Sequence, residues 1–154
     1  MATQTPSQTK KVTEILNKQV ANMALLYVKL HNYHWYVQGA EFYALHAKFE
    51  ELYDEIAGYY DELAERMLAL GERPAGTMAE TLQLASLKEA SGKEPTESMV
   101  GQTIHDFTTV TKELTEGIAA AESAGDQPTA DIFISIRKSL EKHAWMLKAF
   151  LGQT

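Results

Sequence analysis

The sequence of 154 residues contains no cysteine. That absence excludes a disulfide scaffold, a zinc site built on thiolates and a cysteine nucleophile. Long apolar runs are missing too, because no stretch approaches the roughly 18 residues that a membrane-spanning helix requires. Residues 1–11 are polar and lack the apolar region of a signal peptide. We therefore expect a soluble cytoplasmic protein with one compact domain.

Positive charge is also scarce, with 14 basic residues against 21 acidic ones and a formal net charge of −7. Such a chain is repelled by phosphate unless its positive charge is concentrated in one place. The basic pair that we single out, Lys10 and Lys11, lies in a short N-terminal tail. The acidic excess suits the attraction of cations better than the binding of nucleic acid.

Four long segments have the periodicity of amphipathic helices, and no strand-like alternation competes with them. Glycine and proline mark their ends, and Thr or Asp provides N-caps for the last two. The predicted helices cover residues 11–38, residues 41–70, a third segment from Thr96 as N-cap to Gly125, and a fourth from Asp126 as N-cap to Leu151. Tyr27 belongs to the apolar stripe of the first segment.

The connection between the second and third helices, residues 72–94, is long and has no extended periodic pattern. Residues 79–87 within it are predicted to form a short helix. A connection of this length permits a crossover along a four-helix bundle, which a simple up-and-down bundle does not need. We expect an all-α protein with a flexible tail over residues 1–10 and a single bundle domain over residues 11–154.

Two pairs of polar residues on the second helix have metal-ligand spacing. His46 and Glu50 are four residues apart, as are Asp61 and Glu65, so each pair can face one ion. Glu50 and Asp61 are about 16 Å apart along the axis, too far to share an ion. Either the two pairs form two unrelated sites, or a twofold axis places Asp61 and Glu65 of a second chain opposite His46 and Glu50 of the first. The alternative is a solvated acidic face.

Specific motifs run along nearly the whole chain. They are His31-Asn-Tyr-His34-Trp35-Tyr-Val-Gln-Gly39, Phe42, Leu45-His46, Phe49-Glu50-Glu51-Leu52-Tyr53, Asp61-Glu62-Leu63-Ala64-Glu65-Arg66, Leu70-Gly71, Pro74 and Glu141-Lys142-His143-Ala144-Trp145-Met146-Leu147. Together they closely resemble the Dps family of mini-ferritins. The resemblance implies a ferritin-like four-helix bundle with a short extra helix in the long connection.

The resemblance also implies an iron-oxidising centre shared between two subunits. Its ligands would be His34, His46 and Glu50 of one chain, with Asp61 and Glu65 of its neighbour. Many relatives have aspartate where this chain has Glu50, which offers the same carboxylate on a longer arm. The implied metal is iron, up to two ions per site, with zinc able to substitute. The Glu-x-x-His pairs that hold a diiron centre within one bundle are absent from the sequence.

Other residues keep two interpretations each. His31 would orient a ligand or simply pack. Trp35 would quench reactive oxygen intermediates, as the family suggests, or be a packed aromatic residue. We assign His143 and Trp145 to packing.

The assembly implied by the resemblance is a dodecameric shell of tetrahedral symmetry built from twofold dimers. Its iron-entry pores would lie near the start of the fourth helix, where Asp126, Asp131 and Glu122 are candidates. The alternative is helix capping for Asp126 and surface charge for the other two. The expected function is oxidation of Fe(II), preferentially by hydrogen peroxide, with storage of ferric mineral and protection of DNA. The competing functions are nucleoid binding and a plain structural bundle.

Overall fold

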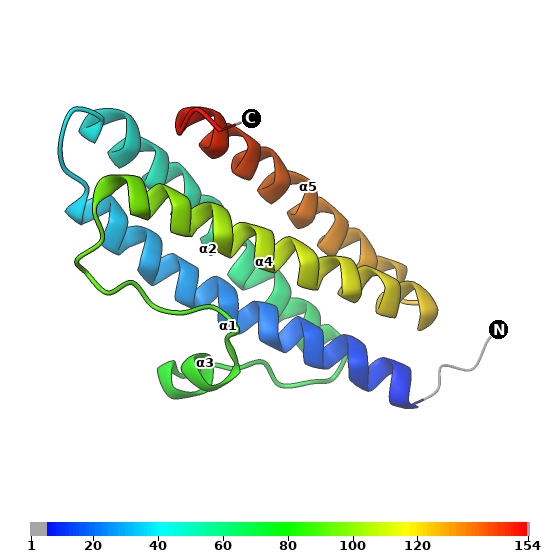
Figure 1. Ribbon diagram of the computed structural model, residues 1–154. Helices are drawn as coiled ribbons and strands as arrows, with labels where there is room; N and C mark the ends of the chain where they lie inside the picture. The colour runs from blue at the N-terminus through cyan, green and yellow to red at the C-terminus, as the bar shows by residue number, and fades with distance from the viewer. Residues whose placement is uncertain (1–5, 154) are drawn as a thin grey trace.

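The computed structural model describes residues 6–153, and within them it contains five α-helices and no strand. Four helices are long and form a bundle, while the short one lies outside it (Figure 1). The helices are α1 (Pro6–Tyr36), α2 (Phe42–Ala69), α3 (Met78–Leu84), α4 (Thr96–Ser123) and α5 (Gln127–Phe150). No helix in the described part of the chain is sufficiently long and apolar to span a membrane.

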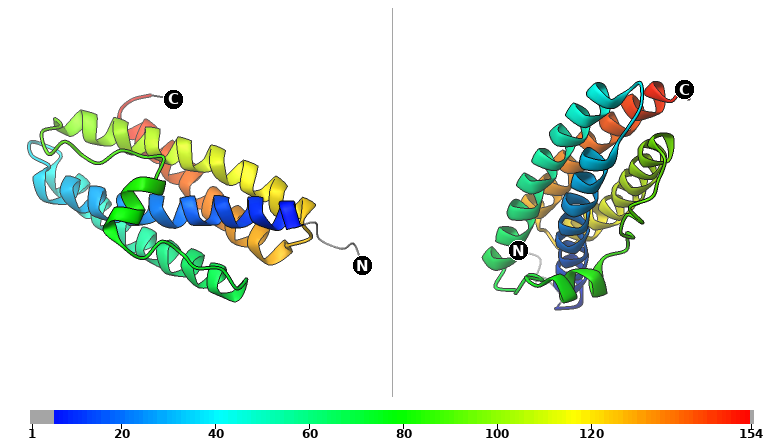
Figure 2. Two further views of the ribbon diagram at one scale, coloured as in Figure 1. Left: turned by 90° about the horizontal axis from the view of Figure 1, so that it is seen from below. Right: turned by 90° about the vertical axis from the view of Figure 1, so that its left-hand side faces the viewer.

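The bundle has the crossover connection that the sequence predicts. Helices α1 and α2 run antiparallel, as do α4 and α5, whereas α2 and α4 run in the same direction (Figure 1). Residues 70–95 therefore travel the length of the bundle between the end of α2 and the start of α4, and α3 packs against α1 on the way (Figure 2). This arrangement confirms the predicted ferritin-like, all-α fold.

The helix bounds differ from the predicted ones at a few positions. Helix α1 begins at Pro6, so residues 6–10 of the predicted tail are helical, because proline is favoured in the first turn of a helix. Residues 1–5, the rest of that tail, lie outside the described residues. The short helix covers residues 78–84, three residues less at its end than predicted.

Two predicted N-caps have different outcomes. Asp126 caps α5 as predicted, because its carboxylate accepts a hydrogen bond from the backbone N–H of Thr129. Thr96 does not cap α4, since it is the first helical residue and Pro95 occupies the cap position. The Thr96 hydroxyl instead donates to the carbonyl oxygen of Gln38 at 2.8 Å, which fixes the turn between α1 and α2.

The apolar stripes of the four long helices meet in one core. Its fully buried side chains include Leu16, Met23, Leu30, Phe49, Leu52, Ile56, Leu63, Phe107, Leu114, Phe133, Ile136 and Leu140. Tyr27 is an exception to the predicted stripe, because its side chain is 40% exposed and packs beside His31 and Tyr53. Each long helix therefore has one face fixed in the core, and its other face is available to carry exposed functional residues.

Buried polar contacts hold the crossover segment against α1. The Asn22 amide donates to the Ser86 hydroxyl at 3.0 Å and accepts from the backbone N–H of Ser86 at 2.9 Å. Lys29 donates to the carbonyl oxygen of Lys88 at 2.7 Å and lies 2.7 Å from Asp106 of α4. Buried polar groups need such partners to offset desolvation, so these contacts specify where the crossover lies.

Candidate metal centre

Two histidines face each other where α1 ends and α2 begins. Nδ1 of His34 lies 2.7 Å from the carbonyl oxygen of His46, and Nδ1 of His46 lies 2.7 Å from the carbonyl oxygen of His34. The rings are stacked, with centroids 3.7 Å apart and planes 15° apart. A carbonyl oxygen accepts but cannot donate, so both Nδ1 atoms carry hydrogen. With the hydrogen on Nδ1, the nitrogen of each ring that can offer a lone pair to a cation is Nε2.

The short turn between α1 and α2 makes this pairing possible. Gly39 has φ of +101°, a left-handed conformation that glycine adopts without a steric penalty. The N–H of Phe42 donates to the carbonyl oxygen of Gly39, and the Phe42 ring then stacks on His46 with centroids 4.9 Å apart. The histidines are thus held from both the backbone and the ring faces, which lowers the entropy lost on binding a metal.

The three predicted carboxylate ligands are exposed on α2. Glu50 lies one turn after His46, on the same side of the helix. Asp61 and Glu65 lie further along the same continuous helix, and the eleven residues from Glu50 to Asp61 span about 16 Å. Among residues 6–153 of one chain, no group of three or more His, Asp or Glu side chains is close enough to hold a metal ion.

An aromatic cluster lies beside the histidine pair, and its central residue is Tyr53, for which the sequence predicted no role of its own. Tyr53 stacks on His31 with centroids 3.6 Å apart, meets His34 edge-on at 5.3 Å, and its hydroxyl is 3.5 Å from Oε1 of Glu50. Desolvation and the neighbouring carboxylates of Glu50 and Asp54 raise the pKa of Tyr53 above its ordinary value. The signal for Tyr53 is its spacing of three from Glu50, which places both on one helix face.

The two tryptophans singled out in the sequence are both exposed in the protomer. Trp35 is 64% exposed, with its ring 5.4 Å from that of His31, so it is not a packed core residue of its own chain. Trp145 is 65% exposed, and its predicted packing is therefore wrong within the protomer. It follows His143 by two residues on α5, and that spacing turns it away from the core.

The predicted packing of His143 is confirmed, and it includes a polar network. His143 is buried, and its Nδ1 accepts from the Lys48 ammonium at 3.3 Å. Its Nε2 lies 2.9 Å from Oε2 of Glu55, whose other oxygen accepts from the Ser139 hydroxyl at 2.9 Å. Burial opposes ionisation of Glu55, but hydrogen bonding by His143 and Ser139 outweighs it, and the pKa of Glu55 is lowered.

The candidate pore residues lie near the turn between α4 and α5. Asp126 is buried, and its oxygens accept from the backbone and the hydroxyl of Thr129 and from the Arg66 guanidinium at 2.8 Å. These contacts favour the capping interpretation, because the carboxylate is already satisfied by donors. Glu122 and Asp131 are exposed, as both the pore and the surface-charge interpretations require.

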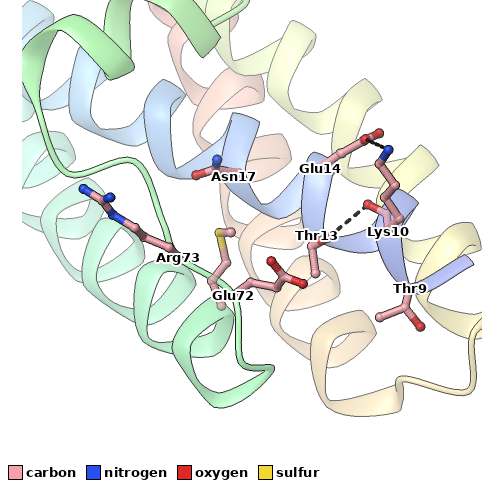
Figure 3. A pocket seen from close by; sticks show the side chains of 8 residues that line it. Thr9, Lys10, Thr13, Glu14, Asn17, Glu72 and Arg73 are labelled. Atoms are coloured by element: carbon pink, nitrogen blue, oxygen red, sulfur yellow. Dashed lines mark hydrogen bonds and ion pairs between the residues drawn. The ribbon is translucent and has the colours of Figure 1, made fainter. Parts of the chain in front are cut away.

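An open pocket of about 730 Å³ lies away from these residues, between the first half of α1 and the segment after α2 (Figure 3). It is lined by charges of both signs and by neutral residues. They are Thr9, Lys10, Thr13, Glu14, Asn17, Met67, Glu72 and Arg73. None of the predicted metal ligands lines it, and it has no histidine, so the pocket is separate from the candidate centre.

Sequence comparisons assign the chain to a known family. A family model of the ferritin-like domain matches residues 13–154. General stress protein 20U of Bacillus subtilis is 52% identical over 93% of this chain and 99% of its own length. DNA protection during starvation protein 2 of Bacillus anthracis is 49% identical over 94% of this chain and 99% of its own length.

Solved structures agree in fold as well as in sequence. A Dps protein from Bacillus brevis superposes with a TM-score of 0.93 at 48% identity, covering 96% of this chain and 99% of that one. Dps from Staphylococcus aureus gives a TM-score of 0.91 at 48% identity, covering 92% and 95%. The chain therefore belongs to the ferritin-like family and, within it, to the Dps proteins.

Proposed function

We propose that the protein oxidises Fe(II), preferentially with hydrogen peroxide, at centres shared between two chains, and stores the ferric product inside a dodecameric shell. Membership of the Dps proteins supports a general role in iron storage and DNA protection. The observation that carries the finer proposal is the reciprocal pairing of His34 with His46, which frees both Nε2 atoms for a cation.

The proposal that two chains share the centre rests on the distance between the candidate ligands along α2. Metal–oxygen and metal–nitrogen bonds are about 2 Å long, whereas Glu50 and Asp61 are about 16 Å apart on one helix. A twofold axis with antiparallel α2 helices would bring Asp61 and Glu65 of one chain opposite the histidines of the other. Both carboxylates are exposed in the protomer, so they are free to serve a neighbouring chain.

The ligand set suits iron in both oxidation states. Imidazole nitrogen binds Fe(II), and carboxylates stabilise the Fe(III) that forms. Two Fe(II) ions each lose one electron, and one hydrogen peroxide molecule takes both electrons with two protons to become two water molecules. This two-electron step produces no hydroxyl radical. Zinc binds the same donor types, and a Dps structure from Listeria innocua comes from a zinc-soaked crystal.

A second candidate function, DNA coating, is favoured by relatives named DNA protection during starvation proteins. In this chain the basic pair Lys10 and Lys11 is weak support, since both residues lie in helix α1 and Lys10 is 3.8 Å from Glu14 in an ion pair. Binding to DNA at physiological salt requires several cationic contacts. We propose that the protein protects DNA mainly by removing iron and peroxide, with weak or absent direct binding.

Stopped-flow absorbance tests the proposed activity. Assembled protein is loaded with Fe(II) without oxygen and mixed with hydrogen peroxide or with air. We expect faster oxidation with peroxide and a soluble iron core, and at least about a tenfold loss of rate in the His34→Ala, Asp61→Ala double variant. The control replaces His105 and Glu116, two exposed residues of α4, by alanine. Wild-type rates in the ligand variant would refute the site.

A further inference from the structure

Glu50 is a candidate ligand whose long, exposed side chain can adopt several conformations. It is exposed, and glutamate has one more rotatable bond than aspartate, the shorter carboxylate residue. Ordering a flexible side chain costs free energy when it binds. Glu50 would therefore be a weaker ligand than aspartate unless another group limits where its carboxylate can point.

Tyr53 lies where it can limit the conformations of the Glu50 side chain. The Tyr53 hydroxyl is 3.5 Å from Oε1 of Glu50, one turn away on α2. The Tyr53 ring also meets the ring of His34 edge-on, with centroids 5.3 Å apart and planes at 89°. The same phenol thus touches a candidate carboxylate ligand through its hydroxyl and a candidate histidine ligand through its ring.

The position of Tyr53 is fixed by neighbours on α1. His31 stacks on the Tyr53 ring at 3.6 Å with planes 17° apart, and Tyr27 meets it edge-on at 6.0 Å. His31 is in turn held by a hydrogen bond from its Nδ1 to the carbonyl oxygen of Tyr27, at 2.7 Å. A ring that is held on these sides presents its hydroxyl at a defined place.

We propose that Tyr53 is a positioning residue for Glu50 and that His31 is the platform which holds Tyr53 in place. The proposal rests on the proposed function, because it assigns Glu50 to the metal centre. The hydroxyl donates to Oε1 and keeps the carboxylate on the side of α2 that faces the histidine pair. The hydrogen bond is long, at 3.5 Å, and hydrogen bonds at functional sites often tighten when the bound complex forms. His31 then orients the ligand Glu50 indirectly, by packing against Tyr53. Both interpretations of His31, orienting a ligand and simple packing, therefore apply.

Anaerobic Co(II) titration of the assembled protein tests this proposal. Calorimetry gives the affinity, and the visible absorption of Co(II) reports the ligands around the metal. The variants are Tyr53→Phe, Glu50→Asp and the double variant, with Tyr60→Phe as a matched control that removes the hydroxyl of another partly buried tyrosine of α2. Phenylalanine keeps the ring and its stacking on His31, so these variants leave the fold intact.

We expect Tyr53→Phe to weaken Co(II) binding about threefold to tenfold and to change the visible spectrum when residue 50 is glutamate. With Glu50→Asp the same change has less than about a twofold effect, because the shorter side chain moves its carboxylate away from the hydroxyl. Tyr60→Phe leaves the affinity unchanged. Equal effects of Tyr53→Phe in both backgrounds, or no effect in either, would overturn the positioning role while leaving the centre in place. Absence of Co(II) binding in the wild type would overturn both the centre and the positioning role.

Discussion

Glu55 and His143 form a residue-scale feature that makes stability depend on pH. Hydrogen bonds from His143 and Ser139 lower the pKa of Glu55 below its ordinary value of 4.5, although burial acts in the opposite direction. A carboxylate with a lowered pKa in the folded state stabilises the fold above its unfolded pKa. That contribution is lost as the pH falls from about 4.5 through the pKa of the folded state.

We predict that Glu55→Gln lowers the free energy of unfolding by about 1 kcal/mol at pH 7. The variant then loses less stability than the wild type as the pH falls from 6 to below 4. Thermal unfolding followed by circular dichroism at each pH measures both effects. Glu116→Gln, on the exposed face of α4, is the control and should keep the pH dependence of the wild type. An unchanged acid transition in Glu55→Gln would contradict the prediction.

Only part of the candidate site could be predicted from the types and spacing of residues in the sequence. His34, His46, Glu50, Asp61 and Glu65 are predicted by spacing and resemblance, and they remain predictions as ligands. The reciprocal hydrogen bonds of the histidines could not be predicted, because their acceptors are backbone carbonyls, which every residue has. Tyr53 was missed for a related reason: its role depends on a stack with a residue of another helix.

At the scale of helices, periodicity predicted all four long segments, since burial of one face dominates helix stability. The crossover was permitted by the length of the connection between the second and third segments. Helix ends were less predictable. Pro95 rather than Thr96 occupies the cap position of α4 because the threonine hydroxyl bonds across to Gln38. Such a bond joins two distant parts of the chain, and local sequence preference contains no information about it.

Close approach of helices is a second feature that periodicity does not predict. Gly117 of α4 lies against α5, where an added Cβ atom would be 2.7 Å from the ring of Phe133 and 3.0 Å from Ile15 of α1. Phe133 is fully buried, and close-packed protein interiors leave little room for a side chain to shift. Glycine is needed here because any side chain would push α4 away from its two neighbours.

We predict that Gly117→Ala destabilises the protein by about 1–3 kcal/mol through overpacking, despite the better helix propensity of alanine. The matched control is Gly101→Ala on the same helix, where an added Cβ meets nothing within 4 Å. That change should raise stability by up to about 1 kcal/mol. Chemical denaturation of both variants measures the difference, and equal shifts in the same direction would be incompatible with the close approach.

At the scale of the whole molecule, the isolated protomer exposes large apolar side chains. Tyr43 is 85% exposed and Met78 is 70% exposed, in addition to Trp35 and Trp145. Aromatic residues and methionine are enriched at interfaces between protein chains. The exposure of Trp145 contradicted a packing prediction that considered one chain alone, and it supports the proposed assembly of several chains.

A shared centre makes a specific prediction about mixtures of inactive variants. Shells made only of His34→Ala chains, or only of Asp61→Ala chains, lack a ligand at every centre and should be nearly inactive. In a mixed twofold dimer both substitutions fall on the same centre. The other centre keeps His34 from one chain and Asp61 from its partner, so it is complete.

Unfolding equal amounts of the two variants and refolding them together should therefore restore about a quarter of the wild-type rate of iron oxidation. Random pairing makes about half of the dimers mixed, and each mixed dimer has one complete centre out of two. The control mixture combines His34→Ala with His46→Ala, which belong to the same half of the centre, so every centre in its mixed dimers still lacks one histidine. Recovery in the first mixture but not in the second requires ligands from two chains, whereas a centre built within one chain recovers in neither.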